Sequence, residues 1–467
     1  MSGLPHVVVL GGGPAGCGAA YQLRRTGKAT VSLIEAQDVV GGNAGSFQWG
    51  GQWLDFGSHR LHHTVAPDIL ADIQHMLGPD FGDFARHGRI LLRNRWLHFP
   101  IKPLDLLRRL DKGFALRFAA DAVTTKLARK SSADSFASVL LANLGPTMSH
   151  GFYFPYARKM WGREAEELSA IQARKRVTAG SIAKLLRRLV KPVGKGHYYY
   201  MREGYGQISR RYADEARALG AEIALRSTAS RVERDDATGR WRVTVSTAGD
   251  TRVIDADHVW STIPIPVLAG MTHPAAGPDV QAAARAIQYR AMVLVYVQLP
   301  VDQYTTTDAH YFPEEHIRLT RLSEPKNYFR STEPRGTTVL CGEYPCTVGD
   351  SIWTADEATM ARQMATDVAA AGIPFPAEPV AVLIRHLPQA YPIYLTGYEH
   401  PFGVLDRWAS SHPGMLVYGR QGLFAHDNTH HALFMAYAAV DCLDGTRFDD
   451  RKWHDYRQIF ATHVVED

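Results

Sequence analysis

A glycine-rich turn near the start of the chain carries the clearest chemical signal in the sequence. An apolar, β-branched run ends in G-x-G-x-x-G, with glycines at Gly11, Gly13 and Gly16. The first glycine permits a tight turn, the second lets backbone amides approach a pyrophosphate, and the third lets the next helix pack against the strand. The phosphates then lie at the helix N-terminus, beside Pro14 and Ala15, where free N–H groups and the helix dipole favour negative charge.

An acidic residue strengthens this prediction. Glu35 ends a second β-rich run, residues 30–34, and is followed by Ala36. An acid about 20 residues beyond the glycines hydrogen-bonds the ribose of an adenine dinucleotide. A lone glycine motif is weak evidence, but a strand before it, a helix after it and an acidic strand end together predict a bound dinucleotide. The alternative is a glycine turn in an α/β protein that binds no nucleotide.

Several histidines could supply acid–base chemistry beside a redox cofactor. Because histidine titrates near neutral pH, His426 or His430 could remove a hydroxyl proton while a hydride leaves the adjacent carbon. His59 and His62 are further candidates for this base. For each of them a structural hydrogen-bonding role is the alternative. A zinc site from His426, His430 and His431 has tolerable spacing but no supporting cysteine or acidic pattern, so we expect no metal.

An aromatic stretch at residues 152–162 combines ring systems with cations. Tyr156 and Trp161 could stack on a sugar or a base, and Arg158 with Lys159 could hold a phosphate. An aromatic core beneath a helix is the alternative interpretation.

A basic segment follows between residues 174 and 195, which hold eight lysines and arginines and no acid. A solvated amphipathic helix is one interpretation; a cradle for an anionic substrate and a membrane-surface contact are the others. The net charge of +5 and the sequence pI near 8.9 suit an anionic ligand.

Length and composition restrict the class of protein. A chain of 467 residues is expected to form two or three domains, and 45% hydrophobic with 21% charged residues is ordinary for a globular protein. The four cysteines are too scattered for a disulfide framework, so reduced thiols and a cytoplasmic location are expected. We expect no signal peptide, no membrane-spanning segment and no nucleic-acid partner.

The remaining pattern suggests how the motifs are positioned. Residues 104–190 are mostly helical in period, and residues 288–387 are rich in strands, among them 316–322. A hairpin is expected at 89–100. The chain then returns through a strand at 415–418 to a helix at 431–443.

A second motif beyond the glycine turn resembles a known superfamily. Gly41-Gly42 and the segment Asp55-Phe56-Gly57-Ser58-His59 are similar to the second glycine pair and the D-x-G-x-H segment of the amine oxidase, protoporphyrinogen oxidase and UDP-galactopyranose mutase flavoproteins. The resemblance implies FAD, held noncovalently, with this segment beside the flavin. It extends the expected FAD-binding residues to Gly42, Asn43, Gly57, Ser58, His59, Val232, Thr262, Gly419 and Arg420.

The resemblance reaches into the second half of the chain and implies a substrate site. Arg321 is similar in context to an arginine that grips the substrate pyrophosphate in the mutases, and Tyr391 resembles a tyrosine that lines that site. The expected substrate-binding residues are Tyr156, Arg158, Trp161, Arg321, Asn327, Tyr328, Tyr391 and Tyr394. The sequence departs from the mutases after Gly419-Arg420-x-Gly422, where His426 and His430 replace a tyrosine and an aspartate.

The expected fold is α/β: a Rossmann-type FAD-binding domain with an inserted helical cap and an antiparallel-sheet substrate domain. The FAD domain is predicted at 1–65, 196–265 and 400–446, the cap at 66–195, the substrate domain at 266–399 and a tail at 447–467.

Three functions follow from the resemblance. The first is an FAD-dependent oxidoreductase that removes a hydride from a polar small molecule, anionic, glycosylated or nucleotide-linked. The second is a redox-neutral sugar mutase that requires reduced flavin. The third is a flavin-binding protein without catalysis, motivated by the altered C-terminal motif. The substrate and the oligomeric state are left open.

Overall fold

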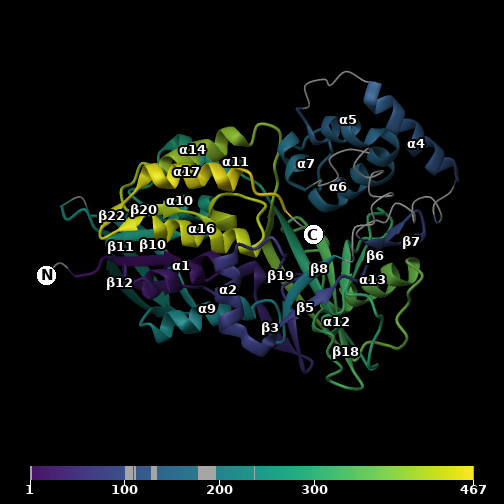
Figure 1. The fold of residues 1–467 in the computed structure, drawn as a ribbon, viewed down its shortest axis with the longest axis horizontal. Coiled ribbons are helices and arrows are strands. Elements are labelled where there is room, and N and C mark those ends of the chain that lie inside the picture. Colours follow the sequence, from purple (N-terminus) through teal and green to yellow (C-terminus); the bar gives the residue numbers. More distant parts are fainter. Residues whose placement is uncertain are drawn as a thin grey trace.

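The computed structural model describes residues 3–99, 109, 112–127, 134–176, 196–235 and 237–465. Most of the basic segment 174–195 therefore lies outside the described residues. Figure 1 shows two halves side by side, a nucleotide-binding half that holds the N-terminus and a second half in which a helical cap stands over a large sheet.

The first half is built on a five-stranded parallel sheet, confirming the expected Rossmann-type core. Its order is β20-β13-β1-β2-β9, and every neighbouring pair is parallel. The strands are Met415–Val417, His258–Ser261, His6–Leu10, Thr30–Ile34 and Glu222–Ala224. Strands far apart in sequence thus place their carboxyl ends at one edge.

The side chains of alternate residues of β1 pack in two separate hydrophobic cores, as expected for a strand buried on both faces. Val7 and Val9 pack beneath helices on one face, and Val8 and Leu10 pack against a second sheet on the other. The helices are α1 (Pro14–Arg25), α2 (Pro67–Leu77), α9 (Gln207–Ala218), α16 (Thr429–Asp441) and α17 (Asp450–Ala461).

The second sheet has the order β12-β11-β10-β14, with strands Asp250–Ala256, Trp241–Thr247, Ser227–Arg234 and Thr272–His273.

Helices α10 (Ile265–Met271), α11 (Pro278–Ala286) and α14 (Glu399–Ser410) complete this half. Their buried side chains, such as Ile265, Ala283 and Leu405, join the core of the second sheet.

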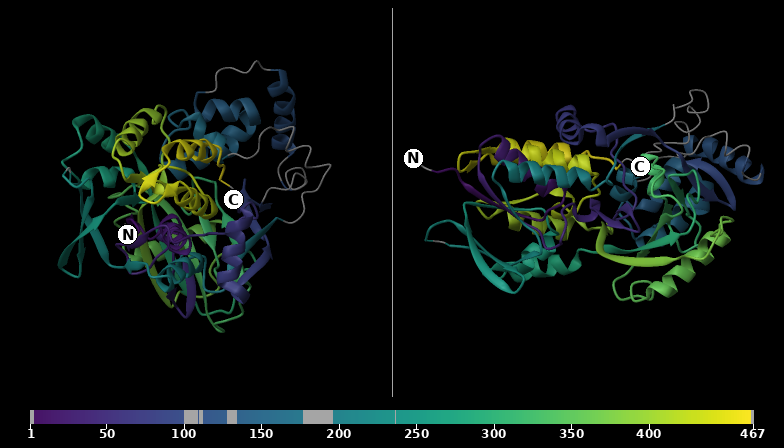
Figure 2. Two further views of the ribbon diagram at one scale, coloured as in Figure 1. Left: turned by 60° about the vertical axis from the view of Figure 1, so that its left-hand side comes forward. Right: turned by 90° about the horizontal axis from the view of Figure 1, so that it is seen from below.

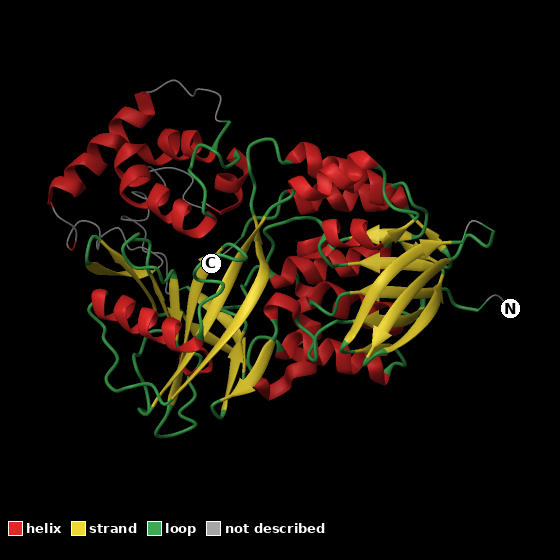
Figure 3. Cartoon of the chain, turned by 180° about the vertical axis from the view of Figure 1, so that it is seen from behind, coloured by secondary structure: helices red, strands yellow, loops and turns green. Residues whose placement is uncertain are grey.

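The second half contains a seven-stranded, mainly antiparallel sheet with the order β19-β15-β18-β17-β16-β6-β7. Its strands are Ala381–Pro392, Tyr289–Leu299, Thr338–Cys346, Arg321–Ser323, Ala309–Tyr311, Gly88–Leu92 and Arg95–Phe99. Figure 3, seen from behind, shows these strands separated from the parallel sheet by loops and helices. Helix α13 (Glu357–Ala370) covers one face, and the hairpin β3–β4 (Ser46–Trp49, Gln52–Asp55) covers the other.

The hairpin expected at 89–100 is confirmed as β6–β7, turning at Arg93 and Asn94 with positive φ. The strand expected at 316–322 is wrong for most of its length, since only Arg321–Ser323 pairs. The carboxylate of Asp367 on α13 accepts the backbone N–H groups of Arg318 and Leu319 at 3.1 and 3.0 Å, which removes them from any strand ladder.

The cap consists of α4 (Lys112–Leu127), α5 (Phe136–Met148), the turn Ser149–Tyr153, α6 (Phe154–Trp161) and α7 (Ala170–Arg176). Its buried residues share one core with Ile90, Leu97 and Tyr311 of the large sheet. Two short elements connect the halves, the strand pair β5–β8 (Phe81–Ala85, His197–Met201) and helix α12 (Lys326–Phe329).

The C-terminal end lies between the two halves, close to the cap, in Figure 1, and Figure 2 gives two further views of it. The N–H of Val465 donates to the carbonyl of Lys175 on α7 at 3.0 Å, which anchors it there. Among the described residues, no helix combines the length and apolar character needed to cross a membrane.

Candidate functional site

The glycine turn between β1 and α1 has the shape that a pyrophosphate requires. Gly11 has φ +98°, and a Cβ at Gly16 would lie 1.9 Å from the carbonyl oxygen of Gly11, so both positions need glycine. A Cβ at Gly13, by contrast, would meet no protein atom within 4 Å. Gly13 precedes α1, and no side chain caps that helix. The turn therefore leaves open space and a helix N-terminus at the place where phosphates bind in this motif.

Glu35 lies directly across this turn. It follows β2, its side chain is buried, and it accepts the Gly12 N–H at 2.6 Å and the Gln37 N–H at 2.8 Å. These contacts fix the carboxylate at the edge of the turn. Because a carboxylate has about four acceptor positions, two remain for the hydroxyl groups of a ribose.

The second glycine pair packs against the first turn. The Gly41 N–H donates to the Gly12 carbonyl at 2.7 Å, and a Cβ at Gly42 would lie 3.4 Å from the Cα of Gly13. The Asn43 amide donates to the carbonyl of Gln389 at 3.0 Å, at the end of β19. The loop after β2 thus joins the nucleotide turn to the large sheet.

Residues from late in the chain close the same edge. Thr262, after β13, donates from Oγ1 to the Leu10 carbonyl at 2.9 Å, and Gly419, after β20, approaches so closely that a Cβ would lie 2.9 Å from that of Ala15. Arg420 donates to the carbonyl of Asp427 at 2.9 Å. Val232 is fully buried in the core between the second sheet and the parallel sheet, together with Val8 and Leu10.

A second group of predicted residues gathers around Glu343 on β18. The Ser58 N–H donates to Glu343 Oε1 at 2.8 Å, and the Ser58 hydroxyl hydrogen-bonds the hydroxyl of Tyr328. Arg321 donates two hydrogen bonds to the same carboxylate, from Nε to Oε1 and from Nη2 to Oε2, each at 2.8 Å. Burial lowers the pKa of Arg321, because it disfavours the charged guanidinium. The attraction of Glu343, with smaller contributions from Tyr391 and Tyr311, outweighs burial, so the pKa of Arg321 is raised.

His59 lies beside this group. Its ring stacks on Tyr205 with centroids 5.4 Å apart, and Nε2 lies 3.0 Å from the Phe56 carbonyl. A carbonyl only accepts, so Nε2 carries the proton and the neutral ring keeps a lone pair on Nδ1. Burial lowers the pKa of His59, Asp55 raises it, and the nearby cations Arg321 and Arg420 lower it. A neutral His59 is therefore suited to accept a proton.

A third group is aromatic and lies under α6 and α7. His426 is fully buried; its Nε2 lies 3.1 Å from Gln172 Oε1, and its backbone N–H donates to the Tyr394 hydroxyl. Trp161 meets both His426 and Tyr391 edge-on, at centroid distances of 5.2 and 5.8 Å. This packing favours a positioning role for His426 over that of the base.

The other predicted residues have separate partners. The exposed Arg158 pairs with Glu315 at 2.7 Å, and the Asn327 amide donates to the carbonyls of Thr305 and Thr307. Tyr156 stacks on Phe152 within the cap, with centroids 6.0 Å apart.

His62 and His430 lie close to one hydroxyl, that of Thr64, at 3.1 and 3.3 Å. His430 is buried, and burial lowers its pKa to about 3, with His431 and His62 contributing in the same direction. The catalytic and substrate roles of these residues remain predictions.

The sequence analysis missed a buried ion pair beside the site. Arg60 contacts Asp308 at 3.1 Å, and its guanidinium lies over the rings of Tyr198 and Tyr328 at 5.4 and 5.1 Å. Its position directly after His59 in the D-x-G-x-H segment was the available signal. Glu343 was not among the predicted site residues, because its partners Ser58 and Arg321 come from distant segments.

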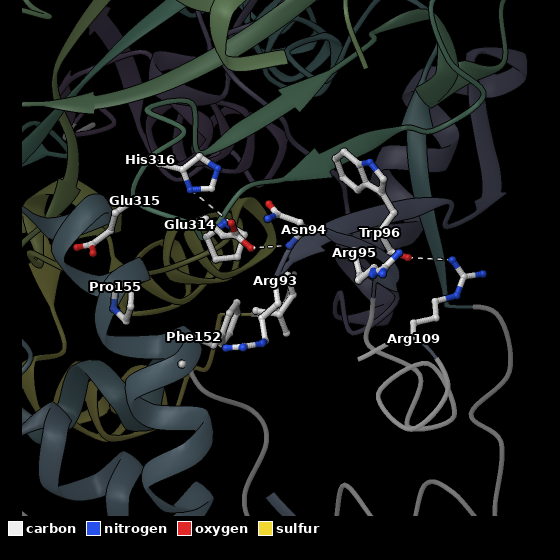
Figure 4. Close-up of a pocket in the computed structure, with 13 residues that line it drawn as sticks. Arg93, Asn94, Arg95, Trp96, Arg109, Phe152, Pro155, Glu314, Glu315 and His316 are labelled. Carbon is white, nitrogen blue, oxygen red and sulfur yellow. Dashed lines mark hydrogen bonds and ion pairs between the residues drawn. The ribbon is translucent and has the colours of Figure 1, made fainter. Parts of the chain in front are cut away.

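Figure 4 shows a different cavity, between the cap and the β6–β7 hairpin. Arg93, Arg95 and Trp96 of the hairpin line it on one side, and Phe152, in the turn before α6, lines it on the other. None of the predicted site residues lines this cavity. The expected FAD-binding residues of the glycine turn, Glu35, Thr262 and Gly419 instead lie at the carboxyl ends of the parallel strands, the edge at which open α/β sheets bind ligands.

A parallel sheet with an open glycine turn, a buried acid across that turn and a second glycine pair together have the arrangement of a Rossmann-type nucleotide-binding domain. The chain belongs to the flavin containing amine oxidoreductase family, whose model matches residues 14–435. The cofactor is FAD, and the open cradle at Gly13 with the buried acid Glu35 fits its adenosine diphosphate portion.

Solved structures share the fold at low identity. Reduced UDP-galactopyranose mutase superposes with a TM-score of 0.82 at 19% identity over 99% of this chain and 100% of the other. A protein assigned as a protoporphyrinogen oxidase from Exiguobacterium sp. 255-15 gives 0.71 at 19% over 94% and 98%. Cyclohexylamine oxidase from Brevibacterium oxydans IH-35A gives 0.65 at 16% over 97% and 99%. A search of curated protein sequences found no significant match.

Proposed function

We propose that this protein is an FAD-dependent oxidoreductase that removes a hydride from a C–H bond next to oxygen or nitrogen on an anionic small molecule that is glycosylated or nucleotide-linked. The observation that carries the proposal is the position of His59. This neutral base lies in the segment expected beside the flavin and within electrostatic range of Arg321 and Arg420. FAD, when bound, accepts the hydride.

The protein side chains bind the substrate and move its proton. Guanidinium groups bind phosphate oxygens well because their donors form a planar fork. Arg321 has two of its donors on Glu343, which fixes the plane of the guanidinium and leaves Nη1 for a substrate anion. His59 Nδ1 takes the hydroxyl or ammonium proton of the substrate.

A redox-neutral mutase is the second candidate. The extent of the likeness to UDP-galactopyranose mutase, which covers 99% of this chain, favours it, as does the proximity of Arg321 to Tyr391. The two functions differ in the oxidation level of the product and in the need for reduced flavin.

Anaerobic incubation with a panel of nucleotide sugars and glycosylated metabolites tests the proposal. Flavin bleaching and product mass are followed together, with and without dithionite. Bleaching with loss of two hydrogens supports the oxidoreductase, and an isomer of unchanged mass, formed only with reduced flavin, supports the mutase. If no compound gives either an oxidised product or an isomer, both proposed enzymatic functions are contradicted. The protein would then bind flavin without catalysis.

Variants connect the result to the site. His59→Asn should slow flavin reduction in single-turnover mixing at least about a hundredfold, the usual contribution of a general base. His75→Asn, an exposed position on α2, is the control and should leave the rate unchanged. An unaffected rate in His59→Asn would remove His59 as the base.

A further inference from the structure

A buried carboxylate just before α16 has only long contacts to its neighbours. Asp427 is 2% exposed, and neither carboxylate oxygen has a hydrogen-bond partner of normal geometry among the described residues. Burying a carboxylate is unfavourable unless hydrogen bonds or a positive charge compensate it. A bound cation would supply this compensation.

Two imidazole nitrogens converge on this carboxylate. His431 lies one turn along α16, and His463 follows α17; the Nδ1 atom of each lies 3.4 Å from Asp427 Oδ1. The three atoms all lie within 4.8 Å of one another. We call Asp427, His431 and His463 the carboxylate–imidazole cluster.

The spacing matches metal coordination better than direct hydrogen bonding. Ligands about 2.1 Å from a tetrahedral ion are about 3.4 Å apart, which is the separation from Asp427 Oδ1 to each nitrogen. A charge-assisted N–H···O bond would be shorter, about 2.7–2.9 Å.

The nitrogens also present lone pairs. His431 Nδ1 accepts the backbone N–H of Asn428 at 3.2 Å, so in the neutral ring it has no proton to give to Asp427. His463 Nδ1 has no hydrogen-bond partner among the described residues. A bound ion would take over the lone pair that now receives the long Asn428 contact.

We propose that the carboxylate–imidazole cluster binds one Zn²⁺. Two imidazole nitrogens and one carboxylate oxygen are a donor set that zinc favours, whereas Mg²⁺ and Ca²⁺ prefer oxygen ligands. The side chains of His431 and His463 are 13% and 10% exposed, which gives the ion a route and leaves a fourth position for water.

The zinc ion would connect the segment after α17 to the start of α16. His463 comes from the segment beyond α17, while Asp427 follows the turn that holds Arg420, whose guanidinium binds the Asp427 carbonyl. Lys175 of the cap donates to the His463 carbonyl at 3.1 Å. Zinc therefore joins the start of α16 to the segment after α17, and the Lys175 contact ties that segment to the cap.

Zinc titration of the FAD-loaded, chelator-treated protein by calorimetry tests the proposal independently of any enzymatic activity. One equivalent should bind with micromolar or tighter affinity, and Co²⁺ in its place should give the visible absorption of a tetrahedral site. His463→Ala should weaken zinc binding at least about tenfold, a change of about 1.4 kcal/mol. It lies near the chain end, so the fold should persist, as circular dichroism will show.

His454→Ala is the matched control, an exposed histidine on α17 that should leave the affinity unchanged. Asp427→Asn, which keeps the volume and removes the charge, should abolish binding. The proposal is overturned if the parent protein binds no zinc below about 100 μM (about 5.5 kcal/mol), or if His463→Ala binds as tightly as the parent. In the second case the site lies elsewhere.

Discussion

Arg321 and Glu343 form a two-donor ion pair across neighbouring strands, β17 and β18, in the centre of the large sheet. Both N···O distances are 2.8 Å, and the side chains are only 16% and 3% exposed. The same carboxylate accepts the Ser58 N–H from the segment expected beside the flavin. One buried carboxylate therefore connects the large sheet to the segment expected beside the flavin.

This pair predicts an asymmetric response to mutation. Arg321→Met leaves Glu343 buried without its cation and should lower the free energy of unfolding by about 3–5 kcal/mol. The cost is large because the remaining buried charge is no longer compensated. The double variant Arg321→Met with Glu343→Gln removes both charges and should regain at least half of that loss. Urea unfolding of the single and double variants measures the difference, and equal losses would contradict it.

The glycine turn predicts that two substitutions of the same size have different effects. Gly16→Ala brings a Cβ within 1.9 Å of a carbonyl oxygen and should destabilise the fold itself. Gly13→Ala meets no protein atom within 4 Å, so the apoprotein should keep its stability while FAD binds at least about tenfold more weakly (1.4 kcal/mol). Thermal unfolding of the apoproteins and FAD titration separate the two effects; normal FAD affinity in Gly13→Ala would place the phosphates elsewhere.

Glu35 predicts a loss of cofactor affinity. Glu35→Gln keeps one acceptor oxygen for the two neighbouring amides, loses the other, and removes the charge that strengthens bonds to ribose hydroxyls, so FAD affinity should fall by about 1.5–3 kcal/mol, roughly ten- to a hundredfold. Glu222→Gln on β9, whose carboxylate pairs with the exposed Arg252, is the control. Calorimetric titration of both apoproteins with FAD measures the effect, and equal affinities would contradict the ribose contact.

The sequence predicted the nucleotide half well because its signals are local. The turn at Gly11 to Gly16 and the acid Glu35 lie within one strand–helix–strand unit, where spacing determines geometry. The half that holds the large sheet was less predictable. Arg321 was recognised only through resemblance, and its pairing with Glu343 was not predicted, because the two residues meet by strand pairing rather than by spacing.

The irregular segment before Arg321 shows the same limit. Its apolar pattern favoured a strand, but Asp367 takes its N–H groups, a side-chain contact from a helix that follows later in the chain. Likewise, the sequence indicated His426 as a candidate base, but its spacing does not predict that it packs in a buried aromatic group against Gln172.

A buried histidine in the large sheet predicts how stability depends on pH. His310 on β16 is buried against Trp96, and burial lowers its pKa from 6.5 to about 4, although Asp308 opposes this; Arg89 and His87 lower it further. Between pH 6.5 and 4 the unfolded chain therefore binds more protons than the folded protein, so stability falls as the pH drops through this range. The largest slope from one such group is about 1.4 kcal/mol per pH unit.

His310→Gln, which keeps polar atoms but does not titrate, should flatten this dependence. Its stability relative to the parent should improve by about 1–3 kcal/mol on going from pH 7 to pH 4.5, as linkage from one such group allows. Urea unfolding at half-unit pH steps measures it, with the exposed His75→Gln on α2 as the control that should follow the parent curve. Parallel curves for His310→Gln and the parent would show that His310 is not the group whose protonation opposes folding.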